Sequence, residues 1–441
     1  MRKNKLLALG LAALMAASVA GCSTPSASVD DTKAAESGSD SSQSAAAGEK
    51  IFRYSNTADI ATIDPDKTNS VADATVSYHI YDGLYRNVQG ELQPATAESY
   101  EVSDDGLVYT FKLRQDTKWS DGQTVTAKDY EYGMKRLCDP AAACPASYLG
   151  AVLKNGAKVS EGELPVDELG VKALDDFTLE ITLENPADYF VSMTSMSAFM
   201  PVREDLVEKY GNEFGGSADK QVYNGPFVVT EYANGKVELA KNPDYYDNEK
   251  ISLDGVEILT VADQTTAVSM FDAGELDLAE VPTELAAQYE GKTQSYYSGA
   301  DDYAALNHRN KYLANKNLRL AMNYAVNREE YILLTHNGLY QANQRYVLPQ
   351  VRGVDGEYGT EYPLEAFPLQ GDMDKAKEYL DTALSELGLS SASDISLKLV
   401  VSDSDTAKKE AEVVANQWKN NLGINVDINM VPYATKNALL V

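Results

Sequence analysis

Adjacent acidic residues are the first candidates for chemistry in this chain of 441 residues. Asp104-Asp105, Asp175-Asp176 and Asp301-Asp302 are pairs that could serve as general acid and base. Most such pairs lie beside glycine or at predicted strand ends, however, where solvated carboxylates are common. The sequence also contains no Gly-x-Ser-x-Gly elbow, zincin helix or phosphate-binding glycine-rich loop. These observations favour a protein that is not an enzyme.

Histidine and cysteine, the usual ligands of transition metals, are rare in this chain. His79, His308 and His336 are scattered along the sequence, and none is adjacent to a cysteine. Structural zinc sites bring Cys and His together at characteristic spacings, and no such spacing is present. We therefore expect no metal site and no cofactor.

Cys138 and Cys144 are close enough in sequence to close a small disulfide loop. Outside the cytoplasmic membrane such a bond persists, because the environment is oxidising. The intervening Asp139-Pro140 predicts a turn, however, which could hold the two thiols apart. The sequence leaves a disulfide and two free thiols as alternatives.

The first residues predict export and membrane attachment. Three basic residues precede an apolar run over residues 6–20, a pattern typical of a signal peptide and too short to span a membrane. The run ends in Val19-Ala20-Gly21-Cys22, which resembles the bacterial lipobox. We therefore expect a lipoprotein signal peptide over residues 1–21 and lipidation of Cys22. The protein would then be extracytoplasmic and lipid-anchored to the bacterial cell membrane. The alternative is an ordinary signal peptide followed by an incidental cysteine.

Composition narrows the class of protein that follows. Residues 22–49 are rich in Ser, Ala, Asp and Gly and predict a flexible linker. The formal net charge of -29 argues against nucleic-acid binding, because such a surface repels phosphates. The length and an apolar fraction of 44% suffice for two or three folded lobes. The 28 tyrosines favour a binding protein, since tyrosine combines a flat apolar face with a polar tip.

Periodic patterns predict the elements that must position any site. Apolar residues alternate with polar ones over residues 107–113 and 177–183, which indicates two strands. Between them Thr126-Ala127-Lys128-Asp129 resembles a capping box that begins a helix. Farther on, Asn317 is a plausible helix cap, and residues 376–388 follow helical spacing up to a terminal glycine.

A compact unit lies close to the end of the chain. Residues 397–401 predict a buried strand, residues 407–418 a helix and residues 424–430 a second strand. A strand, helix and strand at this spacing indicate a parallel crossover and therefore an α/β lobe.

Seven segments together resemble one known family. They are Ile63-Asp64-Pro65, Ile80-Tyr81-Asp82-Gly83-Leu84, residues 98–140, Asn224-Gly225-Pro226-Phe227, and residues 241–246, 318–328 and 420–426. In this order they are similar to the extracytoplasmic solute-binding proteins of peptide-type ABC importers, which include oligopeptide- and dipeptide-binding proteins. The likeness extends from about residue 51 to the end of the sequence. Each segment also fits an ordinary turn, cap or helix end, so the segments identify the fold rather than the ligand.

The resemblance implies an α/β, two-lobed periplasmic-binding-protein type II-like fold with an extra domain inserted in the first lobe. Lobe I would comprise residues 50–82 and 206–299, the inserted domain residues 83–205, and lobe II residues 300–441. The family's "W-x-ADY" segment has no match in this sequence. On this basis we expect the chain to lack a C-terminal part.

Ligand-facing positions are also implied by the resemblance, although packing is an alternative for each. The candidate peptide-binding residues are Asn69, Tyr148, Tyr223, Asn224, Gly225, Tyr303 and Tyr433. Asn69 is neutral where some relatives have an acidic ligand contact. Tyr303 matches a strand that crosses between the lobes, and Tyr433 a position where relatives can carry tryptophan.

The resemblance thus implies a membrane-anchored substrate-binding protein that captures oligopeptides and delivers them to an ABC transporter permease. The expected partners are a peptide ligand, the permease subunits and the membrane, the last through the lipid anchor. One alternative is that the same scaffold binds another solute, such as a dipeptide, a nickel chelate, a sugar or a signalling peptide. A secreted hydrolase and a surface adhesin or sensor are weaker alternatives.

Overall fold

The computed structural model describes residues 49–439 except residues 234, 365–366, 433–434 and 437–438. The predicted signal peptide, Cys22 and the predicted linker up to residue 48 lie outside this part, as does Tyr433. Buried apolar residues form two separate clusters, one drawn from residues 54–258 and one from residues 318–424. Each cluster is the core of a body that contains both helices and strands.

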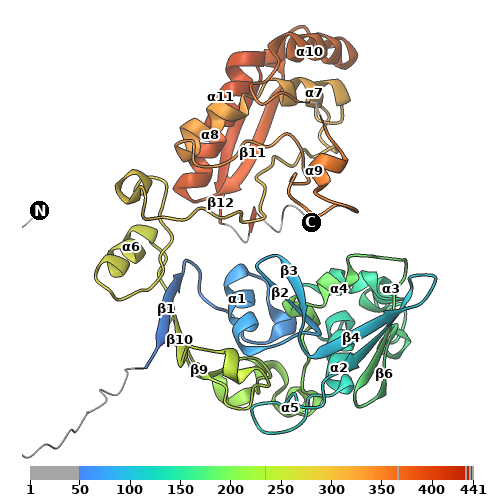
Figure 1. Cartoon of the computed structure of the whole chain (residues 1–441). Helices are drawn as coiled ribbons and strands as arrows, with labels where there is room; N and C mark the ends of the chain where they lie inside the picture. The colour runs from blue at the N-terminus through green and yellow to red at the C-terminus, as the bar shows by residue number, and fades with distance from the viewer. Residues whose placement is uncertain (1–48, 234, 365–366, 433–434, 437–438, 440–441) are drawn as a thin grey trace, which may run out of the picture. The chain divides into compact units, whose positions relative to one another are not determined.

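A mixed four-stranded sheet lies in the first body (Figure 1). Its order is β1 (Ile51–Asn56), β10 (Gly255–Thr260), β9 (Lys236–Lys241) and β8 (Phe227–Ala233). β1 pairs with β10 in parallel, whereas the other two pairings are antiparallel. The sheet therefore joins residues from the start of the described chain to residues some two hundred positions later. The domain boundaries themselves stay a prediction.

A second four-stranded sheet belongs to the same body and is antiparallel throughout. Its order is β4 (Ala97–Val102), β5 (Val108–Leu113), β7 (Thr178–Thr182) and β6 (Val171–Asp175). The two strands predicted from alternation are β5 and β7, which confirms both. Phe111 on β5 and Leu179 on β7 are fully buried, because the apolar positions of each strand face one side.

Helix α2 (Ala127–Cys138) packs against this second sheet and begins at the predicted capping box. The Thr126 backbone N–H donates to the Asp129 carboxylate over 2.7 Å. Tyr130, Met134 and Leu137 are fully buried and share the helix face that covers β6 and β7. The 3.6-residue period thus places one apolar stripe on the sheet.

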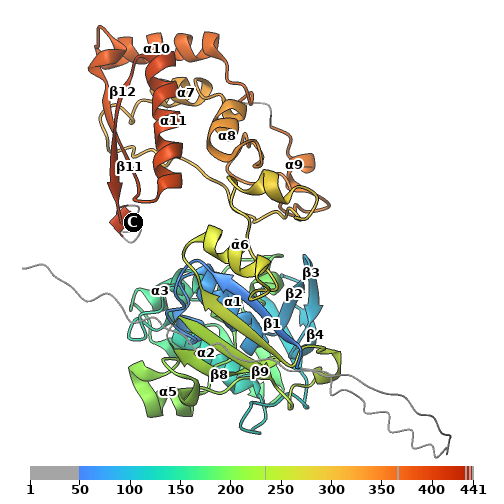
Figure 2. The ribbon, with the colours of Figure 1, turned by 90° about the vertical axis from the view of Figure 1, so that its left-hand side faces the viewer.

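The second body is built around the predicted strand–helix–strand unit (Figures 1 and 2). β11 (Ser396–Ser402) and β12 (Asn425–Val431) pair in parallel, and α11 (Asp405–Leu422) connects them. This confirms the predicted crossover. Helices α7 (Lys316–Tyr324) and α10 (Met373–Leu387) pack together, and the Trp418 indole N–H of α11 donates to the Met322 carbonyl over 3.0 Å.

Helix ends in this body differ from the sequence prediction at one place. Gly388 ends α10 in the left-handed conformation, as predicted. The N-cap of α7 is Asn315 rather than Asn317, because the Asn315 side chain accepts from the Leu318 N–H. The Asn317 amide instead donates to Glu386 over 2.9 Å, so its side chain joins α7 to α10.

Other α-helices and strands lie elsewhere along the described chain. They are α1 (Val71–Ile80), β2 (Tyr85–Val88), β3 (Glu91–Pro94), α3 (Gly156–Ser160), α4 (Phe190–Met193), α5 (Glu204–Tyr210), α6 (Gln264–Asp272), α8 (Arg328–His336) and α9 (Tyr358–Glu361). Tyr303, predicted to lie on a strand that crosses between the lobes, lies outside every helix and strand. The prediction of a strand there is wrong, because residues 300–306 have no ladder partner in the part of the chain that the structure describes. Within the described residues no helix combines the length and apolarity needed to cross a bilayer.

The cap of α2 provides a test of the fold. Replacing Asp129 with Ala removes the acceptor of the Thr126 N–H, so we expect a loss of about 1 kcal/mol in unfolding free energy. Lys128→Ala is the matched control, because its ion pair with Asp176 is solvent-exposed and should contribute less than about 0.5 kcal/mol. Urea unfolding followed by circular dichroism measures both. Equal losses in the two variants would contradict the capping role.

Candidate functional site

A buried carboxylate, Asp82, lies at the meeting point of three of the segments that carry the family resemblance. Its backbone N–H donates to the Asn224 side-chain oxygen over 3.1 Å, and its carbonyl accepts from the Asn224 amide over 2.9 Å. Its carboxylate accepts from the hydroxyls of Tyr245 and Tyr246 over 2.7 and 2.9 Å. The segments around residues 82, 224 and 245 are thereby tied together.

Arg86 completes this network from strand β2. Its guanidinium donates to the hydroxyls of Tyr245 and Tyr246 over 2.5 and 3.0 Å and to Asp247 over 3.0 Å. Burial raises the pKa of the Asp82 carboxyl, while Arg86 and the two tyrosine hydroxyls oppose that change. Such a buried network of hydrogen bonds stabilises one arrangement of the chain.

The neighbouring Tyr223 and Gly225, predicted as ligand-facing, are also part of this packed turn. The Tyr223 side chain is buried against Tyr81, and its hydroxyl donates to the Ala218 carbonyl over 3.1 Å. A Cβ atom at Gly225 would lie 2.5 Å from the backbone of Ile80 and Tyr81, so only glycine fits. For Tyr223, Asn224 and Gly225 the structure favours packing, the alternative that the sequence left open.

A second buried polar group fixes the loop that leads to Asn69. Arg136 of α2 donates to the carboxylates of Asp64 and Asp66, with the closest contacts at 2.6 and 2.7 Å. Burial raises the pKa of the Asp66 carboxyl, and the Arg136 guanidinium opposes this. The Ile63-Asp64-Pro65 motif therefore joins this loop to helix α2, which packs against the second sheet.

Asn69 itself is exposed at the end of the anchored loop. The preceding Thr68 hydroxyl lies 2.9 Å from the Ser197 hydroxyl, and the Lys67 ammonium donates to the Ala142 carbonyl. The Asn69 side chain is thus presented to solvent on a backbone that buried contacts hold. This is the arrangement expected of a binding residue positioned by a rigid scaffold.

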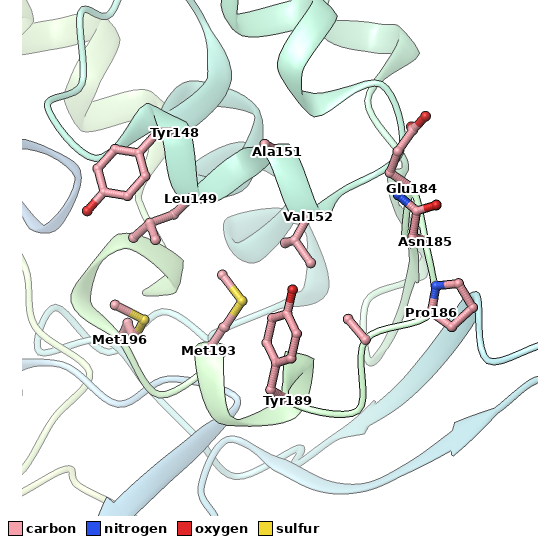
Figure 3. A pocket seen from close by; sticks show the side chains of 11 residues that line it. Tyr148, Leu149, Ala151, Val152, Glu184, Asn185, Pro186, Tyr189, Met193 and Met196 are labelled. Carbon is pink, nitrogen blue, oxygen red and sulfur yellow. The ribbon is translucent and has the colours of Figure 1, made fainter. Parts of the chain in front are cut away.

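Tyr148 lies at the edge of an open hollow of about 540 Å³ in the first body (Figure 3). Leu149 and Val152 project into it from one side, and Met193 and Tyr189 from the other. Its other lining residues are Ala151, Glu184, Asn185, Pro186, Ala187 and Met196. The side chains of Tyr148 and Tyr189 are 73% and 64% exposed. Apolar, aromatic and methionine side chains around a hollow suit adaptable binding of apolar groups rather than proton transfer.

Tyr303, the last candidate within the described residues, is exposed and contacts Tyr346 edge to face, with ring centroids 5.0 Å apart. It does not line the hollow beside Tyr148. Among the described residues, none of the other predicted ligand-facing residues lines this hollow. Tyr189, Met193 and Met196 were missed by the sequence prediction, because their segment carries no periodic pattern or motif.

Cys138 and Cys144 are both buried and free, so the disulfide allowed by their spacing is not formed. The reason is local geometry. The Cys138 sulfur lies against Gly150, whereas the Cys144 thiol donates to the Arg136 carbonyl over 3.5 Å. Burial raises the pKa of Cys138 to about 11 and that of Cys144 to about 12, which leaves both thiols protonated and unreactive near neutral pH.

One grouping contradicts the expectation that the histidines lie apart from other metal ligands. Ligand atoms of Asp302, His336 and Glu410 lie within 4.8 Å of one another. The sequence could not indicate this cluster, because its members come from three distant segments that only the fold brings together.

Comparison with known proteins assigns the family. Residues 91–440 match the family described as "Bacterial extracellular solute-binding proteins, family 5 Middle". The chain belongs to this family. It is 32% identical over 378 residues to the "Oligopeptide-binding protein OppA" of Bacillus subtilis, covering 83% of this chain and 68% of that protein. It is 31% identical over 397 residues to the "Probable deoxycholate-binding periplasmic protein YgiS" of Escherichia coli, covering 88% of this chain and 72% of that protein.

The fold agrees with this family as well. The chain superimposes on "Listeria monocytogenes OppA bound to peptide" with a TM-score of 0.71 and 28% identity, covering 89% of this chain and 79% of that one. The family 5 protein therefore has the predicted α/β fold of the two-lobed, type II-like binding proteins. Five of the seven segments that carried the resemblance meet around Asp82 and Arg136, and the other two lie in the second body.

The Arg136 ion pairs provide a test of this scaffold. Arg136→Met leaves two buried carboxylates without their cation, so we expect a loss of about 3–5 kcal/mol in unfolding free energy near neutral pH. Without Arg136 the folded-state pKa of Asp66 rises further above its unfolded value. The stability of the variant should therefore fall as pH rises from about 4 and recover on acidification.

Urea unfolding at several pH values measures this dependence, with Arg53→Met as the control. Arg53 pairs with Glu257 and Asp277, but its side chain is 40% exposed, and such pairs contribute about 0–1 kcal/mol. A deficit of Arg136→Met that stays constant across the pH range would contradict the coupling.

Proposed function

We propose that this family 5 protein is a membrane-anchored receptor that captures oligopeptides outside the cytoplasmic membrane and delivers them to an ABC transporter permease. The observation that carries the proposal is the match, over 89% of the chain, to an OppA structure bound to peptide. The 32% identity to an oligopeptide-binding protein supports it independently.

The hollow beside Tyr148 supports a peptide ligand on chemical grounds. Its walls are apolar and its rim carries Glu184 and Asn185, so it can accept a side chain while polar groups stay at the edge. Tyr148 and Tyr189 offer large flat surfaces that lose little conformational entropy on binding. Methionines such as Met193 can adapt to side chains of different shape, which suits a receptor for varied peptides.

Binding rather than catalysis is the function that the candidate groups support. Solute-binding proteins of family 5 are binding proteins. The buried carboxylates Asp64 and Asp82 are engaged by Arg136 or by tyrosine hydroxyls, and both buried thiols are protonated. A general acid or nucleophile must instead be free to meet its substrate.

The lipid anchor belongs to the same proposal. A lipid on Cys22 and a flexible linker over residues 22–49 would hold the receptor near its permease. Tethering converts docking into an encounter at high effective concentration, while the linker leaves room to bind and release. Mass spectrometry of the membrane fraction tests the anchor, because the Cys22→Ala variant should lose the lipid adduct.

Isothermal titration with a mixed oligopeptide library tests capture directly, and we expect saturable binding heat. In the Tyr148→Ala variant the affinity for a selected peptide should fall by about tenfold, or about 1.4 kcal/mol, because a large contact surface is lost. The control is Tyr362→Ala, which removes an exposed tyrosine outside the hollow and should leave the affinity unchanged.

Deoxycholate serves as the competing solute in the same titrations, since one relative is named for it. Binding of deoxycholate with no heat from any peptide would overturn the peptide proposal. Equal affinity of Tyr148→Ala and the unaltered protein would exclude the hollow as part of the peptide site.

A further inference from the structure

Three potential metal ligands from separate segments converge in the second half of the chain. Asp302 precedes the second body's first helix, His336 is the last residue of α8, and Glu410 lies on α11. The imidazole and carboxylate atoms that could coordinate an ion all lie within 4.8 Å of one another. Helices α8 and α11 pack together, so the spacing between His336 and Glu410 is set by the fold.

The His336 imidazole is held in place, but its Nε2 atom has no hydrogen-bond partner among the described residues. It is only 5% exposed and stacks on Tyr340 with ring centroids 4.0 Å apart and planes at 5°. Its Nε2 atom lies 3.1 Å from a Glu410 carboxylate oxygen. The two atoms are not aligned for a hydrogen bond, and within the described residues Nε2 has no other partner. A buried imidazole nitrogen without a partner is costly, and such groups call for a physical explanation.

Charged groups on several segments surround His336. Burial raises the pKa of Glu410 to about 7, and the negative charge of Asp302 adds to the effect. Burial also lowers the pKa of His336. Glu284 contributes further negative potential, and Lys409 opposes it, although the Lys409 ammonium also donates to the Thr335 carbonyl.

We propose that Asp302, His336 and Glu410 form a binding site for a divalent transition-metal cation of the zinc type. One imidazole nitrogen and two carboxylates are ligands that zinc accepts, with N and O atoms at about 2.0–2.2 Å from the metal. Two such ligands around a tetrahedral ion are separated by about 3.3 Å, close to the 3.1 Å between His336 and Glu410. Two carboxylates balance the charge of the cation once its binding displaces any proton from Glu410, and a fourth position stays open to water.

The cation would also have a structural consequence. Bound at this site, it would cross-link the segment that carries Asp302 to α8 and α11. Because metal sites of this kind are not preformed in the unfolded chain, binding should stabilise the folded state. This proposal is independent of the peptide-binding function, since it uses none of the residues proposed to contact peptide.

Titration of the metal-free full chain with Zn²⁺ tests the site. We expect one equivalent to bind and the melting temperature to rise. Co²⁺, used as a spectroscopic probe, should give visible absorption bands typical of four-coordinate N/O ligation. Removal of one ligand, as in His336→Gln or Glu410→Gln, should weaken Zn²⁺ binding by at least about tenfold and abolish the Co²⁺ bands.

Matched controls distinguish this site from general attraction of cations to an acidic protein. His308→Gln and Glu412→Gln remove exposed residues of the same types and should leave zinc affinity unchanged. Mg²⁺ should not compete, because it prefers all-oxygen, octahedral sites. Circular dichroism shows whether each variant is folded, and Glu410→Gln is the more conservative of the two ligand variants. Zinc affinity that is unaffected by Glu410→Gln in a folded protein, or lost equally in the controls, would overturn the proposal.

Discussion

One buried carboxylate constrains the packing of the first body, because burying it without hydrogen-bond donors would destabilise the fold. Asp82 is almost fully removed from solvent, and an ionised carboxylate in such a place is strongly destabilising unless several donors satisfy it. Tyr245 and Tyr246 donate to this carboxylate, Arg86 pairs with it ionically over 3.8 Å, and Asn224 bonds the Asp82 backbone. Because the donors come from segments far apart in sequence, satisfying Asp82 requires that β2, the start of β8 and the chain after β9 meet. The family motifs in these segments therefore reflect the packing of the fold, and they do not indicate which ligand is bound.

The same principle, applied at Arg136, explains how an exposed residue such as Asn69 can be held in place. Asp64 and Asp66 fix the loop before Asn69 to α2, and α2 is itself fixed on the second sheet by Tyr130 and its apolar neighbours. Motion of an exposed side chain such as Asn69 therefore does not displace the backbone that carries it. Exposed residues on such a scaffold can be substituted without repacking the core, because the buried polar groups belong to other residues.

Local patterns in the sequence predicted the regular elements well, since those patterns are imposed by nearby residues. Alternation identified β5 and β7, the Thr126–Asp129 pair marked the start of α2, and the crossover of β11, α11 and β12 followed from its periodicities. The site could not be predicted equally well. Whether Asn224 faces a ligand or Asp82 depends on long-range packing, and a turn motif looks the same in both cases. His336 shows the same limit, because its apparent isolation in the sequence disappears once α8 packs on α11.

The residues that select the ligand must therefore lie outside the buried network around Asp82. Relatives named for oligopeptides and for deoxycholate share this scaffold, so a feature common to the scaffold cannot distinguish their ligands. Exposed residues such as Tyr148 and Tyr189, which line a hollow, lie outside this buried network. Specificity is a difference between affinities, and side chains that are not needed for folding can change that difference freely. The burial of Asp82 fixes the frame, and the role proposed for Tyr148 requires no change in that frame.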